Sequence, residues 1–168
     1  AIGIAANVTI FTVVNAVVLK SLPYVQPEQL IAIDETIPSQ NMDNAGVSYP
    51  NYVDWKKSIK GIHDIGVFAE SNITLVTGEG GVRISGAEVS TNMFSLLGVD
   101  AAIGRGFQEQ DGLPSSEKVA LISDVLWRNR FAADPNILGT VVKINGKPTS
   151  IIGVMAPRFR FPATGDIW

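Results

Sequence analysis

The first 19 residues of this 168-residue chain contain no ionisable side chain, and this stretch restricts the fold more than any other feature of the sequence. The stretch, AIGIAANVTIFTVVNAVVL, ends at Lys20. A membrane-spanning helix needs about 20 mostly apolar residues, so the length of this stretch lies at the lower limit for a span. Its polar residues are tolerated in lipid only where they face other helices; they are Asn7, Thr9, Thr12 and Asn15. We therefore expect residues 1–20 to be the end of a truncated transmembrane helix.

Two other interpretations of this stretch compete with a truncated span. A signal peptide fits poorly, because a basic segment at the start and a small-residue cleavage site are both missing. A buried core helix of a soluble protein remains open, since hydropathy alone does not separate it from a short span. The single Lys20 that follows does not orient a span by the positive-inside rule.

Charge and composition exclude some functions. The net charge is -3 and the basic residues are scattered, so no basic patch is available to neutralise a run of phosphates. We therefore expect no nucleic-acid partner. The absence of cysteine excludes a disulfide framework and thiolate metal sites, but it does not decide the compartment.

The clearest element after the apolar stretch is an amphipathic helix that begins near Ser48, a good N-cap. Tyr52, Trp55 and Ile59 recur at steps of three and four, which predicts one buried face. Gly61 is expected to end the helix.

The rest of the chain alternates between strand and helix patterns. Residues 30–33 form a short strand candidate, and residues 65–77 and 82–89 flank a glycine-rich reversal that predicts a hairpin. A short helix over residues 92–97, capped by Ser90 or Thr91, is expected to stop at Gly98. Residues 101–114 are expected to be a loop.

A second α+β unit is expected after this loop. The pattern predicts a buried strand over residues 118–122 and a helix over residues 124–131 with Ser123 as its cap. Asn145-Gly146 is the strongest short hairpin signal, and Pro148 suggests that the returning strand starts at an edge. Hairpins mixed with single helices predict an α+β fold rather than a doubly wound parallel sheet.

Candidate catalytic or binding residues are few. His63, the one histidine, lies after the helix stop and is expected on the surface, and no nucleophile motif, zinc motif or phosphate-binding lysine loop is present. Gly104-Arg105-Gly106 is expected to be a turn rather than a dinucleotide fingerprint.

Charged residues give no stronger candidate. The acidic loop residues lack the spacing of a calcium loop; they are Glu109, Asp111 and Glu117. The two arginines of the predicted helix, Arg128 and Arg130, make at most a weak anion site. We therefore predict a protein that is not an enzyme, with no catalytic, cofactor-binding or metal-binding residues and an unknown substrate-binding site.

Five consecutive blocks resemble the periplasmic core domain of the MacB and FtsX superfamily of ABC transporter permeases. The blocks are GIAANVTIFTVVNAVVLKSLPY (residues 3–24), VSYPNYVDWKK (47–57), VSTNMFSLLGVDAAIGRGF (89–107), VALISDVLWRNRF (119–131) and ILGTVVKINGKPTSIIGVMAPRFRFP (137–162). Their sequences are especially similar to those of the duplicated permeases common in soil bacteria.

The resemblance implies an α+β fold in which a transmembrane or stalk helix leads into a porter-like lobe with a smaller inserted sabre-like lobe. It places the end of the first transmembrane helix at residues 1–20 and the first half of the porter-like lobe at 21–99. The sabre-like lobe would occupy residues 100–162, and 163–168 would start the return to a truncated porter lobe. A sheet edge of the porter lobe would then be left unpaired.

The same resemblance implies a function without catalysis in this chain. The domain would couple cytoplasmic ATP hydrolysis to an extracytoplasmic conformational change, in efflux or mechanotransmission. The implied partners are a cytoplasmic ABC ATPase, a second permease copy or half, membrane lipid, and a periplasmic adaptor or substrate protein. The implied location is the inner membrane of a bacterium, with the domain on the periplasmic side. The alternative that the residues leave open is a soluble or membrane-tethered module that binds a ligand or partner.

Overall fold

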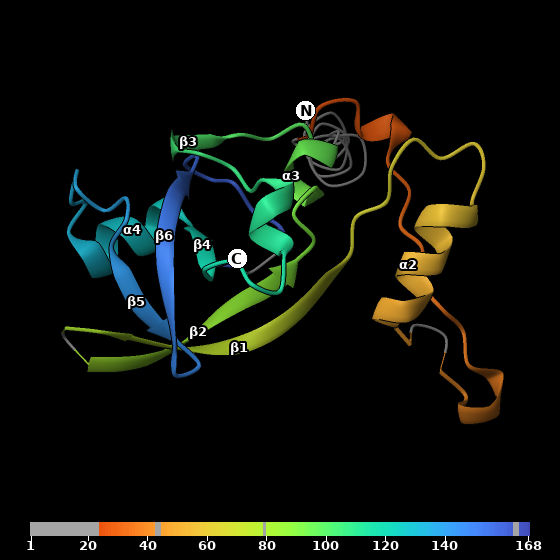
Figure 1. Ribbon diagram of the computed structural model, residues 1–168, viewed down its shortest axis with the longest axis horizontal. Coiled ribbons are helices and arrows are strands. Elements are labelled where there is room, and N and C mark those ends of the chain that lie inside the picture. The colour runs from red at the N-terminus through yellow and green to blue at the C-terminus, as the bar shows by residue number, and fades with distance from the viewer. Residues whose placement is uncertain (1–23, 43–44, 79, 163–164) are drawn as a thin grey trace, which may run out of the picture.

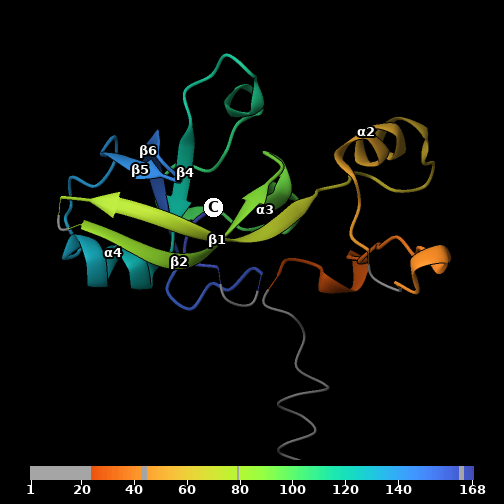
Figure 2. The same ribbon diagram turned by 90° about the horizontal axis from the view of Figure 1, so that it is seen from below.

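The computed structural model describes residues 24–42, 45–78, 80–162 and 165–168. In Figure 1 a curved sheet occupies one side of the molecule, and helix α2 (Tyr49–Ser58) stands apart from it on the other. Figure 2 shows the same separation from a perpendicular direction. We call residues 30–62, which include α2, the arm.

Short helices and strands follow one another along the described chain. Before the sheet come η2 (Pro27–Gln29), η3 (Pro38–Gln40) and α2. The first hairpin and its helix are β1 (Phe68–Thr77), β2 (Gly80–Val89) and α3 (Met93–Leu96). The remaining elements are β3 (Ala101–Gly104), η4 (Glu109–Gly112), β4 (Val119–Ile122), α4 (Asp124–Phe131), β5 (Val141–Ile144) and β6 (Lys147–Met155).

These strands form one sheet in the order β2-β1-β5-β6-β3, and β4 also pairs with β6. The β4 and β6 pair is parallel, whereas the other ladders are antiparallel. Because β6 is paired with β5, β3 and β4, it lies at the centre of the sheet.

The last four described residues close this sheet into a ring. Ile167 bridges Gly86 of β2 in a parallel sense and Ile122 of β4 in an antiparallel sense. Backbone hydrogen bonds reinforce both sides: Ala87 N–H donates to the Ile167 carbonyl at 3.0 Å, and Leu121 and Trp168 exchange two bonds of 2.9 Å. The described residues thus connect β2 to β4 through the C-terminal segment.

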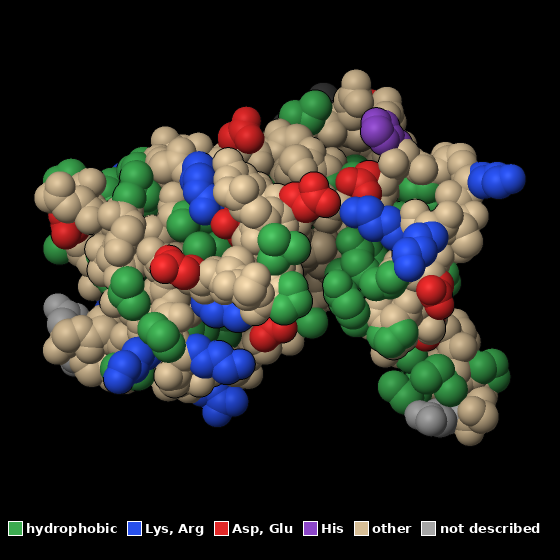
Figure 3. Space-filling view, in the orientation of Figure 1, with side chains coloured by type: hydrophobic (Ala, Val, Ile, Leu, Met, Phe, Trp, Pro, Cys, Tyr) green, Lys and Arg blue, Asp and Glu red, His purple; other side chains and the backbone are tan. Residues whose placement is uncertain are grey.

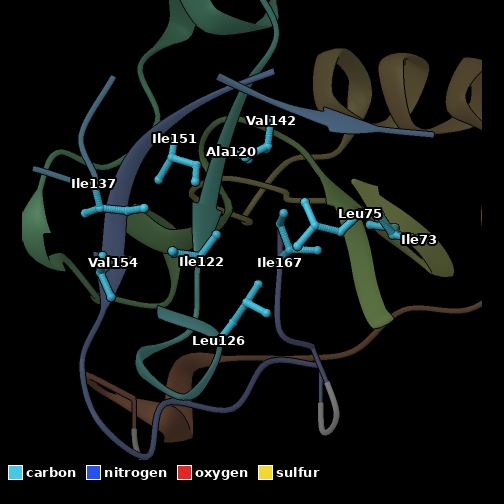
Figure 4. Close-up of a cluster of buried hydrophobic side chains, with 10 residues drawn as sticks. All are labelled: Ile73, Leu75, Ala120, Ile122, Leu126, Ile137, Val142, Ile151, Val154 and Ile167. Atoms are coloured by element: carbon cyan, nitrogen blue, oxygen red, sulfur yellow. The ribbon is translucent and has the colours of Figure 1, made fainter. Parts of the chain in front are cut away.

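Two apolar cores lie on the two faces of the curved sheet. The first lies within the ring and is covered by α4 (Figure 4); its buried residues are Ile73, Leu75, Ala120, Ile122, Leu126, Ile137, Val142, Ile151, Val154 and Ile167. The second lies under α3; its buried residues are Ala87, Met93, Phe94, Leu97, Leu121, Met155 and Trp168. Alternation along β4 places Leu121 in the second core and its neighbours in the first.

Several local predictions are confirmed. The fold class is α+β, and both predicted hairpins form. Asn145 and Gly146 have φ values of 49° and 81°, the conformation that a tight type I′ reversal requires. Ser48 and Ser123 cap their helices, since each side chain accepts a hydrogen bond from the backbone N–H three residues later.

Other local predictions are wrong. Residues 30–33 form no strand, because nothing among the described residues pairs with them, and Ile31 is 69% exposed. Residues 101–114 are not all loop, since β3 pairs with β6 there. Neither Ser90 nor Thr91 caps α3: its N-cap is Asn92, whose side chain makes no capping hydrogen bond.

The predicted apolar stripe of α2 is only partly buried. Tyr52 is 7% exposed, Trp55 is half-buried, and Ile59 is 37% exposed. The helix ends at Ser58 with Ile59 as its C-cap, before the predicted stop at Gly61. The stripe therefore has no complete apolar partner in the described structure.

The predicted transmembrane segment, residues 1–20, lies outside the described residues. Among the helices that are described, none combines the length and apolar character of a membrane span. The division into lobes at residues 99 and 100 stays a prediction, although β1 from the first range and β5 from the second are hydrogen-bonded in one sheet.

The ring closure predicts a large effect of truncating its central side chain. Ile167 is fully buried between β2 and β4, so Ile167→Ala should lower the free energy of unfolding by about 2 to 5 kcal/mol. Val141→Ala is the control, because Val141 is 64% exposed and should change stability by less than about 1 kcal/mol. Denaturant unfolding measures both, and equal effects would show that the C-terminal segment does not close the ring.

Candidate functional site: the Tyr24 junction and the Asp64 clamp

The first described residues dock directly on α3, and we call this contact the junction. Val25 N–H donates to the Leu97 carbonyl at 3.2 Å. The Tyr24 hydroxyl donates to the Arg160 carbonyl at 3.2 Å, and the Tyr24 ring lies 6.3 Å from that of Phe161. Burial raises the pKa of the Tyr24 phenol. Tyr24 and Val25 are therefore tied to α3 and to the loop after β6.

The junction rests on an aromatic cluster centred on Phe94 of α3. Phe94 is 3% exposed, and its ring lies within 6.5 Å of four other aromatic rings; these are Phe107, Phe159, Phe161 and Trp168. Aromatic pairs in edge-to-face geometry add to the stabilisation that burial provides. Since Trp168 belongs to the ring-closing segment, the cluster joins the junction to the sheet.

Gly98 allows the chain to approach α3 closely. Its φ of +68° favours glycine, and a Cβ at this position would lie 2.5 Å from the Val25 Cβ. Any larger residue would push Val25 away from α3.

A second contact, which we call the clamp, fixes the arm near its C-terminal end. The Asp64 carboxylate accepts hydrogen bonds from the Asn92 side chain at 2.7 Å and the Ile65 N–H at 2.8 Å. It also pairs with Lys56 of α2 at 3.2 Å. The Tyr52 hydroxyl donates to the Ile65 carbonyl at 3.4 Å. These bonds connect α2, the segment before β1 and the N-cap of α3 through polar groups.

The clamp favours the charged forms of Asp64 and Lys56 over their neutral forms. Burial raises the pKa of Asp64, but hydrogen bonds from Asn92 and the Ile65 N–H and the pairing with Lys56 outweigh it, so the pKa is lowered overall. Burial lowers the pKa of Lys56, but the hydrogen bonds and charges of Asp64 and Tyr52 together outweigh this, so the pKa is raised overall. The ion pair is partly solvent-exposed and therefore weak by itself.

The arm carries apolar side chains that the described structure does not cover. Tyr52 is its only buried residue among those described. Its exposed large apolar residues are Ile31, Ile33, Met42, Tyr49 and Ile59. Figure 3 shows apolar side chains on the projecting part of the molecule at the right. A helix of this length is marginal in water without apolar packing, so the arm has the character of a contact surface.

The sequence-predicted candidates do not form a catalytic or metal site. His63 is exposed. Asp111 forms a two-bond ion pair with Arg105, at 2.6 and 2.9 Å, instead of joining Glu109 and Glu117 around a cation. The bond to Arg105 lowers the pKa of Asp111. Among the described residues, no group of three possible metal ligands occurs.

The remaining candidates have structural contacts. Arg128 pairs with Asp124 one helical turn earlier, and Arg130 donates to the Gly80 carbonyl at 3.0 Å. They do not converge on a common anion site. The segment 104–106 follows β3 but leads into a loop, as expected for a turn.

Sequence reasoning did not single out the junction or the clamp. Their partners are far apart in the chain, such as Tyr24 and Arg160 or Asp64 and Asn92, and no local pattern links them. The one sequence signal near the junction is Gly98, whose expected role as a helix stop agrees with its positive φ.

Comparison with known proteins identifies the family of this domain. The sequence model of the MacB-like periplasmic core domain matches residues 1–168. The chain belongs to the MacB-like periplasmic core domain family. A search of curated protein sequences found no match.

Two solved structures are similar to this MacB-like domain in fold. The extracellular domain of the noncanonic ABC-type transporter YknZ from Gram-positive bacteria has a TM-score of 0.56 and 22% identity, over 64% of this chain and 56% of that chain. The periplasmic region of MacB from Actinobacillus actinomycetemcomitans has a TM-score of 0.59 and 19% identity, over 73% of this chain and 56% of that chain. The present chain thus matches little more than half of each.

The junction predicts that Gly98→Ala will destabilise this MacB-like domain more than an equivalent change elsewhere. Gly46 is a matched control, because its φ is +69° and a Cβ there would meet nothing within 4 Å. Gly46→Ala should cost about 1 to 2 kcal/mol from backbone strain alone. Gly98→Ala should cost about 1 to 3 kcal/mol more, from the clash with Val25. Thermal or denaturant unfolding measures the difference, and equal costs would refute the docking of Val25 on α3.

The clamp predicts a loosening of the arm in acid. The lowered pKa of Asp64 means that its stabilisation is complete above the unfolded value, about 3.9, and is lost as the pH falls through the folded pKa. Hydrogen-exchange protection of α2 should therefore fall below about pH 4, by a modest amount on the order of 0.5 kcal/mol. Asp64→Asn should weaken protection at neutral pH and flatten this acid response, whereas Asp54→Asn, within α2 itself, should do neither. An unchanged pH profile in Asp64→Asn would count against the clamp.

Proposed function

We propose that this chain is part of the extracytoplasmic core domain of an ABC transporter permease that couples cytoplasmic ATP hydrolysis to extracytoplasmic conformational change. The change would serve efflux or mechanotransmission. The observation that carries the proposal is the family match over residues 1–168, together with the junction that ties Tyr24 and Val25 to the domain.

The junction supports the coupling role in physical terms. The predicted transmembrane helix ends at residue 20, only four residues before Tyr24. A displacement of that helix would move Tyr24 and Val25 first. Because these residues contact α3 and Phe161, the displacement would then act on the Phe94 cluster. Packed cores transmit such strain because they are dense.

The proposed partners follow from the same role. They are a cytoplasmic ABC ATPase, a second permease copy or half, surrounding membrane lipid, and a periplasmic adaptor or substrate protein. We place the domain on the periplasmic side of a bacterial inner membrane and assign it no catalytic step.

The exposed arm supports a porter-like lobe over residues 21–99 that is completed by polypeptide outside this sequence. Its apolar side chains lack a partner among the described residues, and both similar structures extend well beyond the part that this chain matches. The sabre-like lobe would then comprise residues 100–162, with residues 163–168 leading back to the porter-like lobe.

A second candidate function is a ligand-binding or partner-binding module. A hollow of about 280 Å³ lined by polar groups of β1 and β2, including Glu70, Asn72 and Ser85, favours it. Such a hollow would accept a small polar molecule. This module would be soluble or membrane-tethered, and it differs from the first candidate in needing no ATPase.

The proposal predicts the topology and the ATPase partner. These 168 residues contain no cysteine, so Tyr49→Cys, made in a full-length background from which any other cysteine is removed, introduces a single thiol at a position that is 70% exposed. In the full-length protein this thiol should react with a membrane-impermeant maleimide in cells whose outer membrane is permeabilised, and a Walker A ATPase should co-purify. Leu121→Cys, which is fully buried, is the labelling control. Labelling only after lysis of the inner membrane, or purification without an ATPase, would contradict the proposal.

A further inference from the structure

The hollow of about 280 Å³ between β1, β2 and the C-terminal segment gathers polar side chains over a buried floor. We call it the hairpin hollow. Its buried lining residues are Gly86, Pro162 and Gly165, and its polar side chains belong to Glu70, Ser71, Asn72 and Ser85. A few polar groups that converge on one hollow are the usual arrangement of a small-ligand site.

The strand register places the main polar side chains on one face of the hairpin. Asn72 and Ser85 are paired directly across β1 and β2, and directly paired residues project from the same face. Glu70 pairs with Ala87, which is buried in the second core, so Glu70 projects from this same face at the border of that core. The convergence of these groups therefore follows from the backbone.

These polar side chains have no protein partner in the part of the chain that the structure describes. No hydrogen bond or ion pair there engages the side chains of Glu70, Asn72 or Ser85. Arg83 projects from the same face, but it pairs with Thr74, four residues and about 13 Å along β1 from Glu70. The hollow thus offers one carboxylate without a counter-charge, beside an amide and a hydroxyl.

The acceptors of the hollow fit a primary ammonium group. An ammonium carries one positive charge and three N–H donors. The Glu70 carboxylate, the Asn72 amide oxygen and the Ser85 hydroxyl can each accept one of them. A hard metal cation fits less well, because Ca²⁺ takes about six to eight oxygen ligands and the described residues contain no group of three possible metal ligands.

An exposed aromatic ring lies beyond Glu70 on the same face of β1. Phe68 precedes Glu70 by two residues, about 7 Å along a strand, and it is 46% exposed. Its ring packs against that of Phe161 at 4.9 Å, next to Pro162 of the hollow. A short apolar stem joined to the ammonium would lie against Phe68, and a cation near an aromatic ring is itself stabilised.

We propose that the hairpin hollow binds a primary ammonium group on a short apolar stem, with Glu70 pairing with the charge and Asn72 and Ser85 accepting hydrogen bonds from it. The ammonium belongs to a small free amine or to a lysine side chain of a partner peptide. This inference rests on the second candidate function and requires neither an ATPase nor a membrane.

The test follows amide chemical shifts of the complete 168-residue chain in micelles of an uncharged detergent, during titration with n-butylammonium chloride. The matched probe is n-butanol, which has the same stem and a neutral hydroxyl in place of the ammonium. We expect saturable shifts at residues 70–72, 85–86 and 165 with n-butylammonium, and an affinity about 10-fold weaker for n-butanol.

Glu70→Gln should weaken n-butylammonium binding about 10-fold and leave n-butanol binding unchanged. Glu88→Gln is the matched control, because it removes the same charge from an exposed position of the same hairpin. Glu88 pairs with Ala69, so its side chain projects from the opposite face, and its replacement should leave the affinity unchanged. Since both glutamates are exposed, both variants should unfold at the same temperature as the parent.

The peptide acetyl-Gly-Lys-Gly-amide separates the two sources of the ammonium. Tighter binding of the peptide than of n-butylammonium assigns the site to a lysine of a partner, and equal binding assigns it to a free amine. Equal binding of n-butanol and n-butylammonium, or equal effects of Glu70→Gln and Glu88→Gln, would overturn this inference alone. Absence of saturable shifts at the hollow with every probe would overturn it and also deprive the second candidate function of the observation that favours it.

Discussion

The backbone ladder that residues 165–168 form between β2 and β4 determines how the rest of the domain is arranged. Ile167 enters the core within the ring, and the adjacent Trp168 enters the aromatic core under α3. Adjacent strand residues point to opposite faces, so one short segment joins both cores. Trp168 of this segment packs against Phe94 and positions it. Phe94 in turn supports the residues at the junction.

Sequence reasoning succeeded where the determinants are local. Serine caps and the Asn145-Gly146 turn depend on neighbouring residues, and the structure has them as expected. It failed where the determinants are distant. The apolar residues 30–33 resemble a strand but find no partner, whereas β3, with its small residues, becomes a strand because β6 lies beside it. No local pattern predicts that residues 165–168 return to β2 and β4.

The domain combines a rigid and an adjustable part. The ring is held by backbone ladders and two apolar cores, whereas the arm is held by the clamp at Asp64 and by a few apolar contacts. Polar contacts with water on one side break and re-form at little cost in free energy. In the proposed function, movement that arrives at Tyr24 would therefore leave the ring intact and would reach the arm through α3, whose N-cap Asn92 bonds Asp64.

The central claim is that the junction at Tyr24 passes motion from the membrane side into α3. Hydrogen exchange of the full-length permease, with its ATPase in the ATP-bound and nucleotide-free states, tests it most directly. The account predicts that exchange in residues 24–30 and in α3 changes together on ATP binding, while β4 and β6 keep their protection. A change in β4 and β6 with none at residues 24–30, or no change in any of these segments, would contradict it.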